Sequence, residues 1–261
     1  GVNAVVTGGG SGIGRAISLA LAEAGCRVAV LDLDKEASAE TVDLIVAAQG
    51  EAIHIEANVA DAESMERADN EIRRKFSGPC TLLVNNAATL RNGPLSTLSI
   101  ADWNAVLSVN LTGYLICSQI FGRHMMQSGG GSIIHVASIA GSFPQPTSGA
   151  YSVSKAGILM LSRNLSLEWG SKGIRSNVVS PAMVLTPLSQ VIYDNPEIRS
   201  AREAMVPLRR IGSPDDIADA VCFLSSARAS YVNGQEIIVD GGWGNGLLAT
   251  VPRPGFDQQD Q

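Results

Sequence analysis

Short runs of β-branched and aliphatic residues alternate with longer segments of helical periodicity along almost the whole chain. Apolar runs that alternate with helices of about ten residues or more indicate a parallel sheet covered by helices on both faces. Parallel strands of one sheet are joined by right-handed crossovers, which leaves a doubly wound arrangement as the natural topology. The pattern therefore predicts a doubly wound α/β fold.

The predicted strands are Val2–Val6, Arg27–Leu31, Ala52–Glu56, Thr81–Val84, Ser132–Ala137, Arg175–Val179 and Glu236–Val239. The predicted helices are Ile13–Ala24, Lys35–Ala48, Ala62–Lys75, Ile100–Gln127, Ala150–Trp169 and Pro214–Ser225. No linker or repeat divides the chain, so we expect a single Rossmann domain over residues 1–245, with a central parallel sheet of about seven strands and helices on both faces. Its cofactor half spans roughly residues 1–130 and its catalytic and substrate half roughly residues 131–245, followed by a C-terminal tail over 246–261.

Composition excludes several classes of function. The net charge of −6 makes a nucleic-acid surface improbable, because phosphate binding needs clustered Lys and Arg. We find neither an uninterrupted apolar run long enough for a membrane span nor a secretory signal, so no membrane partner is expected. The four cysteines lack CxxC spacing and suggest reduced thiols of a cytoplasmic protein. The three histidines lack the spacing of metal ligands, so no metal site is expected.

A glycine-rich segment, Thr7 to Gly14, follows the first predicted strand and leads directly into a helix. Glycines at positions 8, 12 and 14 permit a tight turn and let backbone N–H groups approach a pyrophosphate at the helix N-terminus. Glycine-rich turns also occur without a ligand, and the spacing here is GxxxGxG instead of GxGxxG. The turn is therefore a candidate dinucleotide site that needs support from elsewhere in the chain.

Asp32 supplies part of that support, because it ends the second predicted strand. A carboxylate at this place can accept hydrogen bonds from the adenosine ribose hydroxyls and would repel a 2′-phosphate. The alternative is a turn or helix N-cap residue, which the neighbouring Asp34 fits better. Arg15 by itself is a weak argument for a phosphate, so we expect the cofactor to be NAD.

Tyr151 and Lys155 are four residues apart on a predicted helix and therefore present a phenol and an ammonium to the same small volume. A phenol is a poor base at neutral pH, and an adjacent cation favours the phenolate. We therefore expect Lys155 to lower the pKa of Tyr151. For the pair alone, an incidental surface Tyr and Lys is the competing interpretation.

Taken in order, these motifs resemble those of the short-chain dehydrogenase/reductase family over Val2–Trp243. The matching segments are Thr7–Gly14 (TGxxxGIG), Asn85–Ala88 (NNAG), Asn110, Ser138, Tyr151, Lys155, Pro181–Thr186 (PGxxxT) and Val239–Gly242 (VDGG). Ala88 and Ala182 replace the usual glycines, and a methyl there costs energy if either position needs a positive φ. Asn58 stands where many members have Asp.

The resemblance implies hydride transfer between a secondary alcohol and a nicotinamide, with four catalytic residues: Asn110, Ser138, Tyr151 and Lys155. Tyr151 would act as general acid and base, Lys155 would lower its pKa and bind the nicotinamide ribose, and Ser138 would donate to the substrate oxygen. Asn110 would hold a water that connects Lys155 to solvent, unless it is a helix Asn satisfied by backbone groups. The implied cofactor contacts are Gly8, Ser11, Gly12, Ile13, Gly14, Asp32, Leu33, Asn58, Val59, Asn86, Ala87, Tyr151, Lys155, Pro181, Val184 and Thr186.

Substrate contacts are expected from two segments, one after Ser138 and one after Pro181. The candidates are Ser138, Ala140, Phe143, Gln145, Tyr151, Met183 and Leu188. The apolar character of the second segment suggests an apolar small molecule, although a helix that packs on the body would show the same pattern. The Asn195-Pro196 break suggests a hinged lid.

Two other functions and an assembly state complete the expectations. An NADPH-dependent 3-oxoacyl carrier-protein reductase is the alternative, against which Asp32 and the uncharged segment 127–131 argue. A catalytically silent cofactor-binding regulatory protein would require damage to the proton-transfer residues, all of which are present. The resemblance also implies a homotetramer.

Overall fold

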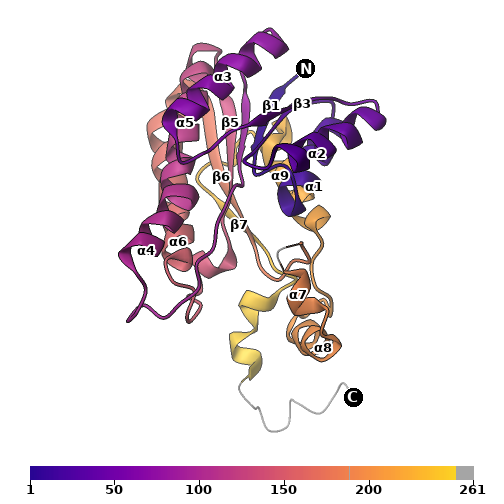
Figure 1. The fold of residues 1–261 in the computed structure, drawn as a ribbon, viewed down its shortest axis with the longest axis vertical. Helices are drawn as coiled ribbons and strands as arrows, with labels where there is room; N and C mark the ends of the chain where they lie inside the picture. Colours follow the sequence, from indigo (N-terminus) through magenta and orange to yellow (C-terminus); the bar gives the residue numbers. More distant parts are fainter. Residues whose placement is uncertain (188, 251–261) are drawn as a thin grey trace.

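The computed structural model describes residues 1–187 and 189–250, the last four through their backbone only. Its centre is a parallel seven-stranded sheet in the order β3-β2-β1-β4-β5-β6-β7 (Figure 1). The strands are β1 (Asn3–Thr7), β2 (Arg27–Asp32), β3 (Glu51–Glu56), β4 (Leu82–Asn85), β5 (Gly131–Val136), β6 (Ile174–Pro181) and β7 (Glu236–Val239). The doubly wound fold is confirmed, and each predicted strand lies within two residues of an observed one.

Helices cover both faces of the sheet (Figure 1). One face carries α1 (Gly12–Glu23), α2 (Lys35–Ala47) and α9 (Pro214–Ser225). The other carries α3 (Ala62–Phe76), α4 (Ile100–Leu107), α5 (Gly113–Gln127) and α6 (Tyr151–Trp169). The short helices α7 (Gln190–Tyr193) and α8 (Pro196–Met205) lie below the sheet in this view, and a 3₁₀ segment over Trp243–Thr250 extends beside them.

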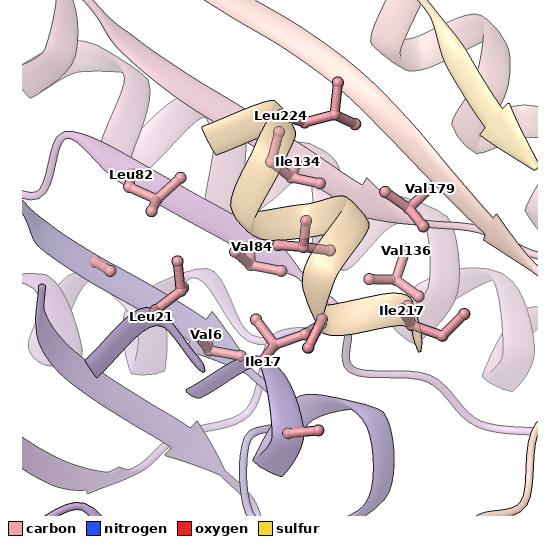
Figure 2. Close-up of a cluster of buried hydrophobic side chains, with 14 of the residues drawn as sticks. Val6, Ile17, Leu21, Leu82, Val84, Ile134, Val136, Val179, Ile217 and Leu224 are labelled. Carbon is pink, nitrogen blue, oxygen red and sulfur yellow. The ribbon is translucent and has the colours of Figure 1, made fainter. Parts of the chain in front are cut away.

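Two apolar layers hold the helices to the sheet. On one face, Ile17 and Leu21 of α1 and Ile217 and Leu224 of α9 pack on strand residues that include Val6 (Figure 2). On the other face, a second buried cluster joins α3 and α5 to the alternate strand residues, which are Val5, Ala29, Leu31, Ile55, Leu83, Ile133 and Ile174. Because neighbouring strand residues point to opposite faces, both must be apolar. This explains the continuous apolar runs seen in the sequence.

The chain order of the strands reverses beside β1. The chain runs outward from β1 to β2 and β3, then returns so that β4 pairs with the other side of β1. Ligands of open α/β sheets bind at the carboxyl ends of the strands at such a switch point. The glycine-rich turn after β1 and the Asn-Asn pair at the end of β4 both lie there.

Two predicted helical features differ from the structure. The helix expected over 100–127 is interrupted by a π-helical turn over Ser108–Thr112, which separates α4 from α5. The Asn195-Pro196 break is a helix start, since Asn195 Oδ1 accepts from the backbone N–H groups of Glu197 (2.9 Å) and Ile198 (3.2 Å) and thereby caps α8. The predicted break therefore lies at the junction of α7 and α8, and the hinged lid stays a prediction.

The helical region Ile100–Gln127 is, in the part of the chain described here, the one stretch with the length and apolarity of a membrane-spanning helix. Half of its most apolar window is buried inside the protein. The helix packs Cys117, Ile120 and Phe121 against the sheet. Its apolar composition is accounted for, at least in part, by this packing.

A histidine is buried in the middle of the sheet, on β5. The Nδ1 atom of His135 lies 3.2 Å from Asn85 Nδ2, and its Nε2 atom lies 3.2 Å from Ser176 Oγ. Its ring stacks on Tyr114 at a centroid distance of 5.8 Å. A neutral imidazole uses one nitrogen as acceptor and one as donor, which fits these two neighbours. Burial, together with the nearby Lys155, lowers the pKa of His135 to about 3.

This buried histidine makes stability depend on pH. The pKa of His135 is about 3 in the folded protein and has its ordinary value of 6.5 in the unfolded chain. Between pH 6.5 and about pH 3 the unfolded chain therefore binds a proton at His135 that the folded protein does not, and the free energy of unfolding falls as the pH falls. A His135→Asn variant should therefore lose less stability on acidification, by about 1.4 kcal/mol per pH unit below about pH 6. Urea unfolding of both proteins between about pH 7 and about pH 5 measures the difference. Parallel stability curves would contradict the assignment.

Candidate active site

The glycine-rich turn is fastened to the end of β4 by Asn86. The backbone N–H of Asn86 donates to Thr7 Oγ1 (3.0 Å), and its side-chain Nδ2 donates to the carbonyls of Thr7 (3.1 Å) and Gly8 (3.0 Å). Gly8 has a φ of 63°, and a Cβ there would lie 2.8 Å from Ala87 Cα. A Cβ on Gly14 would overlap the carbonyl oxygen of Gly8. Glycine is therefore required at both positions by close backbone approach.

A cleft of about 830 Å³ opens at this switch point. It extends from the glycine-rich turn across the carboxyl ends of the strands to the first turn of α6. Every predicted cofactor residue lines it: Gly8, Ser11, Gly12, Ile13, Gly14, Asp32, Leu33, Asn58, Val59, Asn86, Ala87, Tyr151, Lys155, Pro181, Val184 and Thr186. The fold thus brings together residues that are up to 178 positions apart in the chain.

The acidic side chain at the end of β2 faces this cleft in a fixed orientation. Asp32 Oδ2 accepts from the backbone N–H of Gly10 (2.9 Å), and Asp32 Oδ1 accepts from the backbone N–H of Asp34 (3.1 Å). Asp34 in turn caps α2, because its Oδ1 accepts from Ala37 N at 3.0 Å. The two aspartates therefore have separate places, Asp34 at the helix cap and Asp32 on the cleft wall.

Tyr151 and Lys155 lie in the first turns of α6, as the spacing predicted. Lys155 is 2% exposed, and its Nζ donates to the carbonyl oxygen of Val136 at 2.9 Å. The same carbonyl accepts from the Tyr114 hydroxyl at 3.0 Å. Lys155 Nζ lies 5.5 Å from the ring centroids of both Tyr114 and Tyr151. The ammonium is thus enclosed by two aromatic rings and anchored on β5.

Burial dominates the pKa values of this pair. It lowers the pKa of Lys155 to about 7 and raises the pKa of Tyr151, while a hydrogen bond with Ser138 acts to lower the latter. The expectation that Lys155 lowers the Tyr151 pKa is therefore not met in this structure. The physical reason is that desolvation penalises both charged forms, and the ammonium directs its hydrogen bond to Val136.

Asn110 lies in the π-helical turn and is fully buried. Its Oδ1 accepts from Thr89 N (2.8 Å), while its Nδ2 donates to Thr89 O (3.0 Å) and to Ser154 Oγ (3.2 Å). The side chain is therefore occupied in positioning the loop after β4 and does not line the cleft. This agrees with the alternative of a helix Asn satisfied by backbone groups. A water-mediated link from Asn110 to Lys155 stays a prediction.

The predicted substrate residues are brought together only in part. Ser138 and Tyr151 line the cleft. Those that do not are Ala140, which is buried, Phe143 and Gln145, which are exposed, and the half-buried Met183. Leu188 lies outside the described residues.

The segment after β6 lines the cleft close to the glycine-rich turn, since a Cβ on Gly12 would lie 3.6 Å from Thr186 Cβ and from Pro187 Cδ. Backbone hydrogen bonds join Leu185 N to Gly212 O (2.9 Å) and Gly212 N to Met183 O (2.9 Å). Ser189 Oγ donates to Val184 O at 2.7 Å, and Thr186 N donates to Ser189 Oγ at 2.9 Å. This local network fixes the main chain of the segment where it faces the glycine-rich turn.

Several cleft residues were missed by sequence reasoning. They include Thr89, Arg91, Ser108, Val109 and Ser189. Thr89 and Arg91 directly follow the Asn-Asn-Ala-Ala motif, a proximity that could have indicated them. The two alanines that replace family glycines carry no strain, because neither Ala88 nor Ala182 has a positive φ. Between residues 1 and 250, leaving out 188, no group of three His, Cys, Asp or Glu side chains could hold a metal ion.

Comparison with known proteins places this arrangement in a family. A family model described as "Enoyl-(Acyl carrier protein) reductase" matches residues 8–244. The chain is 37% identical over 240 residues to D-threitol dehydrogenase of Mycolicibacterium smegmatis, covering 92% of both chains. It is 39% identical over 249 residues to galactitol 2-dehydrogenase of Rhizobium johnstonii, covering 93% of this chain and 95% of the relative. Reductases named for 3-oxoacyl-[acyl-carrier-protein] also match, at 35–36% identity.

A solved structure agrees in fold. The gluconate 5-dehydrogenase of Burkholderia cenocepacia, in complex with NADP and tartrate, superposes with a TM-score of 0.88 at 32% identity. The match covers 94% of this chain and 96% of that one. With its motifs, sheet order and relatives in agreement, the chain belongs to the short-chain dehydrogenase/reductase family and is an oxidoreductase.

Proposed function

We propose that this protein is an NAD(H)-dependent oxidoreductase that interconverts a secondary alcohol and a ketone, with Tyr151 as general acid and base. One observation carries the proposal. A single cleft has an oriented carboxylate, Asp32, at one end and the Ser138, Tyr151 and Lys155 side chains at the other. A dinucleotide extended between these ends would have its adenosine ribose at Asp32 and its nicotinamide near Tyr151.

The residues present fit such a cofactor. The close backbone approach at Gly8 and Gly14 fixes the turn at the N-terminus of α1, where N–H groups favour a pyrophosphate. Asp32 keeps acceptor capacity on both oxygens for ribose hydroxyls, and its charge would oppose a 2′-phosphate. When bound, the nicotinamide ring supplies the hydride acceptor or donor.

The chain's own residues handle the proton and the developing charge. In ketone reduction the Tyr151 phenol gives its proton to the carbonyl oxygen, and in alcohol oxidation the phenolate removes the proton from the hydroxyl. Ser138, whose Oγ accepts from the backbone N–H of Ala140 at 3.1 Å, can donate its own hydrogen to the substrate oxygen and stabilise the charge there. Lys155, buried beside the phenol, would be a donor to the nicotinamide ribose.

The substrate is expected to be a small molecule. The relatives that act on threitol and galactitol favour a polyhydroxylated secondary alcohol. At the catalytic end the cleft presents Thr89, Arg91 and Ser138, which suit hydroxyl groups. An apolar alcohol, the earlier expectation, finds less support because Phe143 and Met183 do not line the cleft.

The 3-oxoacyl carrier-protein reductase is the competing activity, and relatives with that name exist. Asp32 argues against it through its expected repulsion of NADPH. The segment after α5, Ser128–Gly131, has no basic residue for an acidic carrier.

We also propose a homotetramer in the cytoplasm. Support for assembly comes from exposed apolar side chains on α5 and α6, namely Leu115, Val153, Met160 and Leu167. Support for the cytoplasm comes from the four cysteines, all free thiols.

Turnover assays test the proton role of Tyr151. With NAD⁺ and a panel of sugar alcohols and apolar cyclic alcohols, and with NADH or NADPH and 3-oxoacyl thioesters, we expect Tyr151→Phe to lower turnover at least about a hundredfold while cofactor binding stays nearly intact. Because burial raises the Tyr151 pKa, wild-type oxidation should speed up with rising pH and reduction should stay flat near neutral pH. The matched control is Tyr231→Phe at a fully exposed tyrosine. Comparable turnover by Tyr151→Phe would show that the proton is handled elsewhere.

Binding titrations test the ribose role of Asp32. Asp32→Ala should weaken NADH binding by about thirtyfold, because a charged acceptor of two hydroxyl groups is lost, and should change NADPH binding far less. Asp34→Ala, which removes the neighbouring charge from the helix cap, is the control. Nicotinamide fluorescence gives both dissociation constants. Equal losses for the two cofactors would remove the ribose role.

A further inference from the structure

Arg15, in the first turn of α1, is held beside the glycine-rich turn by hydrogen bonds to backbone and side chain. Its Nε and Nη2 atoms donate to the carbonyl oxygen of Gly10 at 3.0 and 2.7 Å, and Nε also lies 3.1 Å from Thr41 Oγ1. Its side chain is only 25% exposed. The guanidinium therefore has a defined place between α1 and α2.

Glu40 on α2 fixes the rest of that guanidinium. Glu40 Oε1 accepts from Arg15 Nη1 at 3.2 Å, and Glu40 Oε2 accepts from Arg15 Nη2 at 2.7 Å. This is a bidentate pairing, in which two parallel hydrogen bonds fix the orientation of the arginine relative to the carboxylate. All three nitrogens of the Arg15 guanidinium are thereby in use, and Arg15 does not line the cleft.

The Arg15–Glu40 pair adjoins the carboxylate that is proposed to hold the adenosine ribose. Gly10 joins them, since its N–H donates to Asp32 Oδ2 at 2.9 Å while its carbonyl accepts from Arg15. The Arg15 guanidinium thus binds the carbonyl oxygen of Gly10, and the Asp32 carboxylate binds its N–H group. A phosphate on the ribose 2′ position would enter next to Asp32 and would need a nearby cation as counter-charge.

We infer that Glu40 is a specificity-determining residue, which favours NAD by holding Arg15 away from the place of a 2′-phosphate. Selection against NADP then has two parts, the negative charge of Asp32 and the capture of Arg15 by Glu40. The inference rests on the proposed function, because it assumes the adenosine ribose at Asp32. Glu40 lies on α2 and does not line the cleft, so it would act on cofactor binding through Arg15.

A single substitution at Glu40 can remove the ion pair with Arg15 and leave the guanidinium free to bind another anion. Glu40 has a 63% exposed side chain, so its truncation opens no cavity in the core of the protein. A phosphate dianion competes well for a freed guanidinium, which is long enough to turn toward a neighbouring group. Removing the Glu40 carboxylate should therefore change the cofactor preference without changing the fold.

The first experiment measures dissociation constants for NAD⁺ and NADP⁺ by calorimetry on the full chain. Glu40→Ala should bind NADP⁺ about fivefold to tenfold more tightly than wild type, with NAD⁺ affinity unchanged within about twofold. Glu36→Ala is the matched control, because Glu36 is an exposed glutamate in the first turn of the same helix without a contact to Arg15. Its affinities for both dinucleotides should stay at the wild-type values.

The second experiment repeats the substitution in an Arg15→Gln background. There Glu40→Ala should give no gain for NADP⁺, because the cation that it releases is absent. A gain that persists without Arg15, or an equal gain in Glu36→Ala, would overturn the inference. So would a Glu40→Ala variant that binds NADP⁺ no better than wild type while wild type binds NAD⁺. A wild-type protein that binds neither dinucleotide would instead overturn the proposed function.

Discussion

The site depends on one constraint at the centre of the sheet: the turn after β4 is hydrogen bonded to the glycine-rich turn after β1. Asn86, just after β4, bonds with its backbone and its side chain to Thr7, the last residue of β1, and with its side chain to Gly8, which follows. These strands are neighbours because the chain reverses its strand order there. The glycine backbone then comes so close to Ala87 that a side chain at Gly8 would collide with it. These contacts therefore shape the part of the cleft that the glycine-rich turn lines.

Beside the end of the cleft that Tyr151 and Lys155 line is a buried polar layer that is costly to bury. The Val136 carbonyl accepts from both Lys155 and Tyr114, and Tyr114 stacks on His135 in the centre of the sheet. Burial drives the pKa of Lys155 down to about 7 and that of His135 to about 3. Such groups persist only where each has a partner, and here those partners also hold Lys155 in one position beside Tyr151. Positioning and electrostatics are therefore coupled in one small region.

Much of the architecture could be predicted from the sequence because its signals are local. Apolar runs marked the strands, and Asp34 was predicted as a better cap than Asp32, which the structure confirms. The π-helical turn at Ser108–Thr112 could not be predicted, since it fits the same helical periodicity as its neighbours. The Asn195-Pro196 pair predicts a break in the helical pattern, and the structure has one there, between α7 and α8.

The sequence by itself determined the fold class and the order of the elements, and through the family resemblance it indicated many of the residues that line the cleft. These properties follow from local patterns in the sequence, which are the spacing of apolar residues, the order of strands and helices along the chain, and the glycines of the turn. Only the tertiary structure decided how the side chains are used: Asn110 holds Thr89, Lys155 bonds to Val136, and Arg15 is captured by Glu40. The reason is that each of these partners is 19 or more residues away in the chain, so the contact depends on how the helices pack on the sheet.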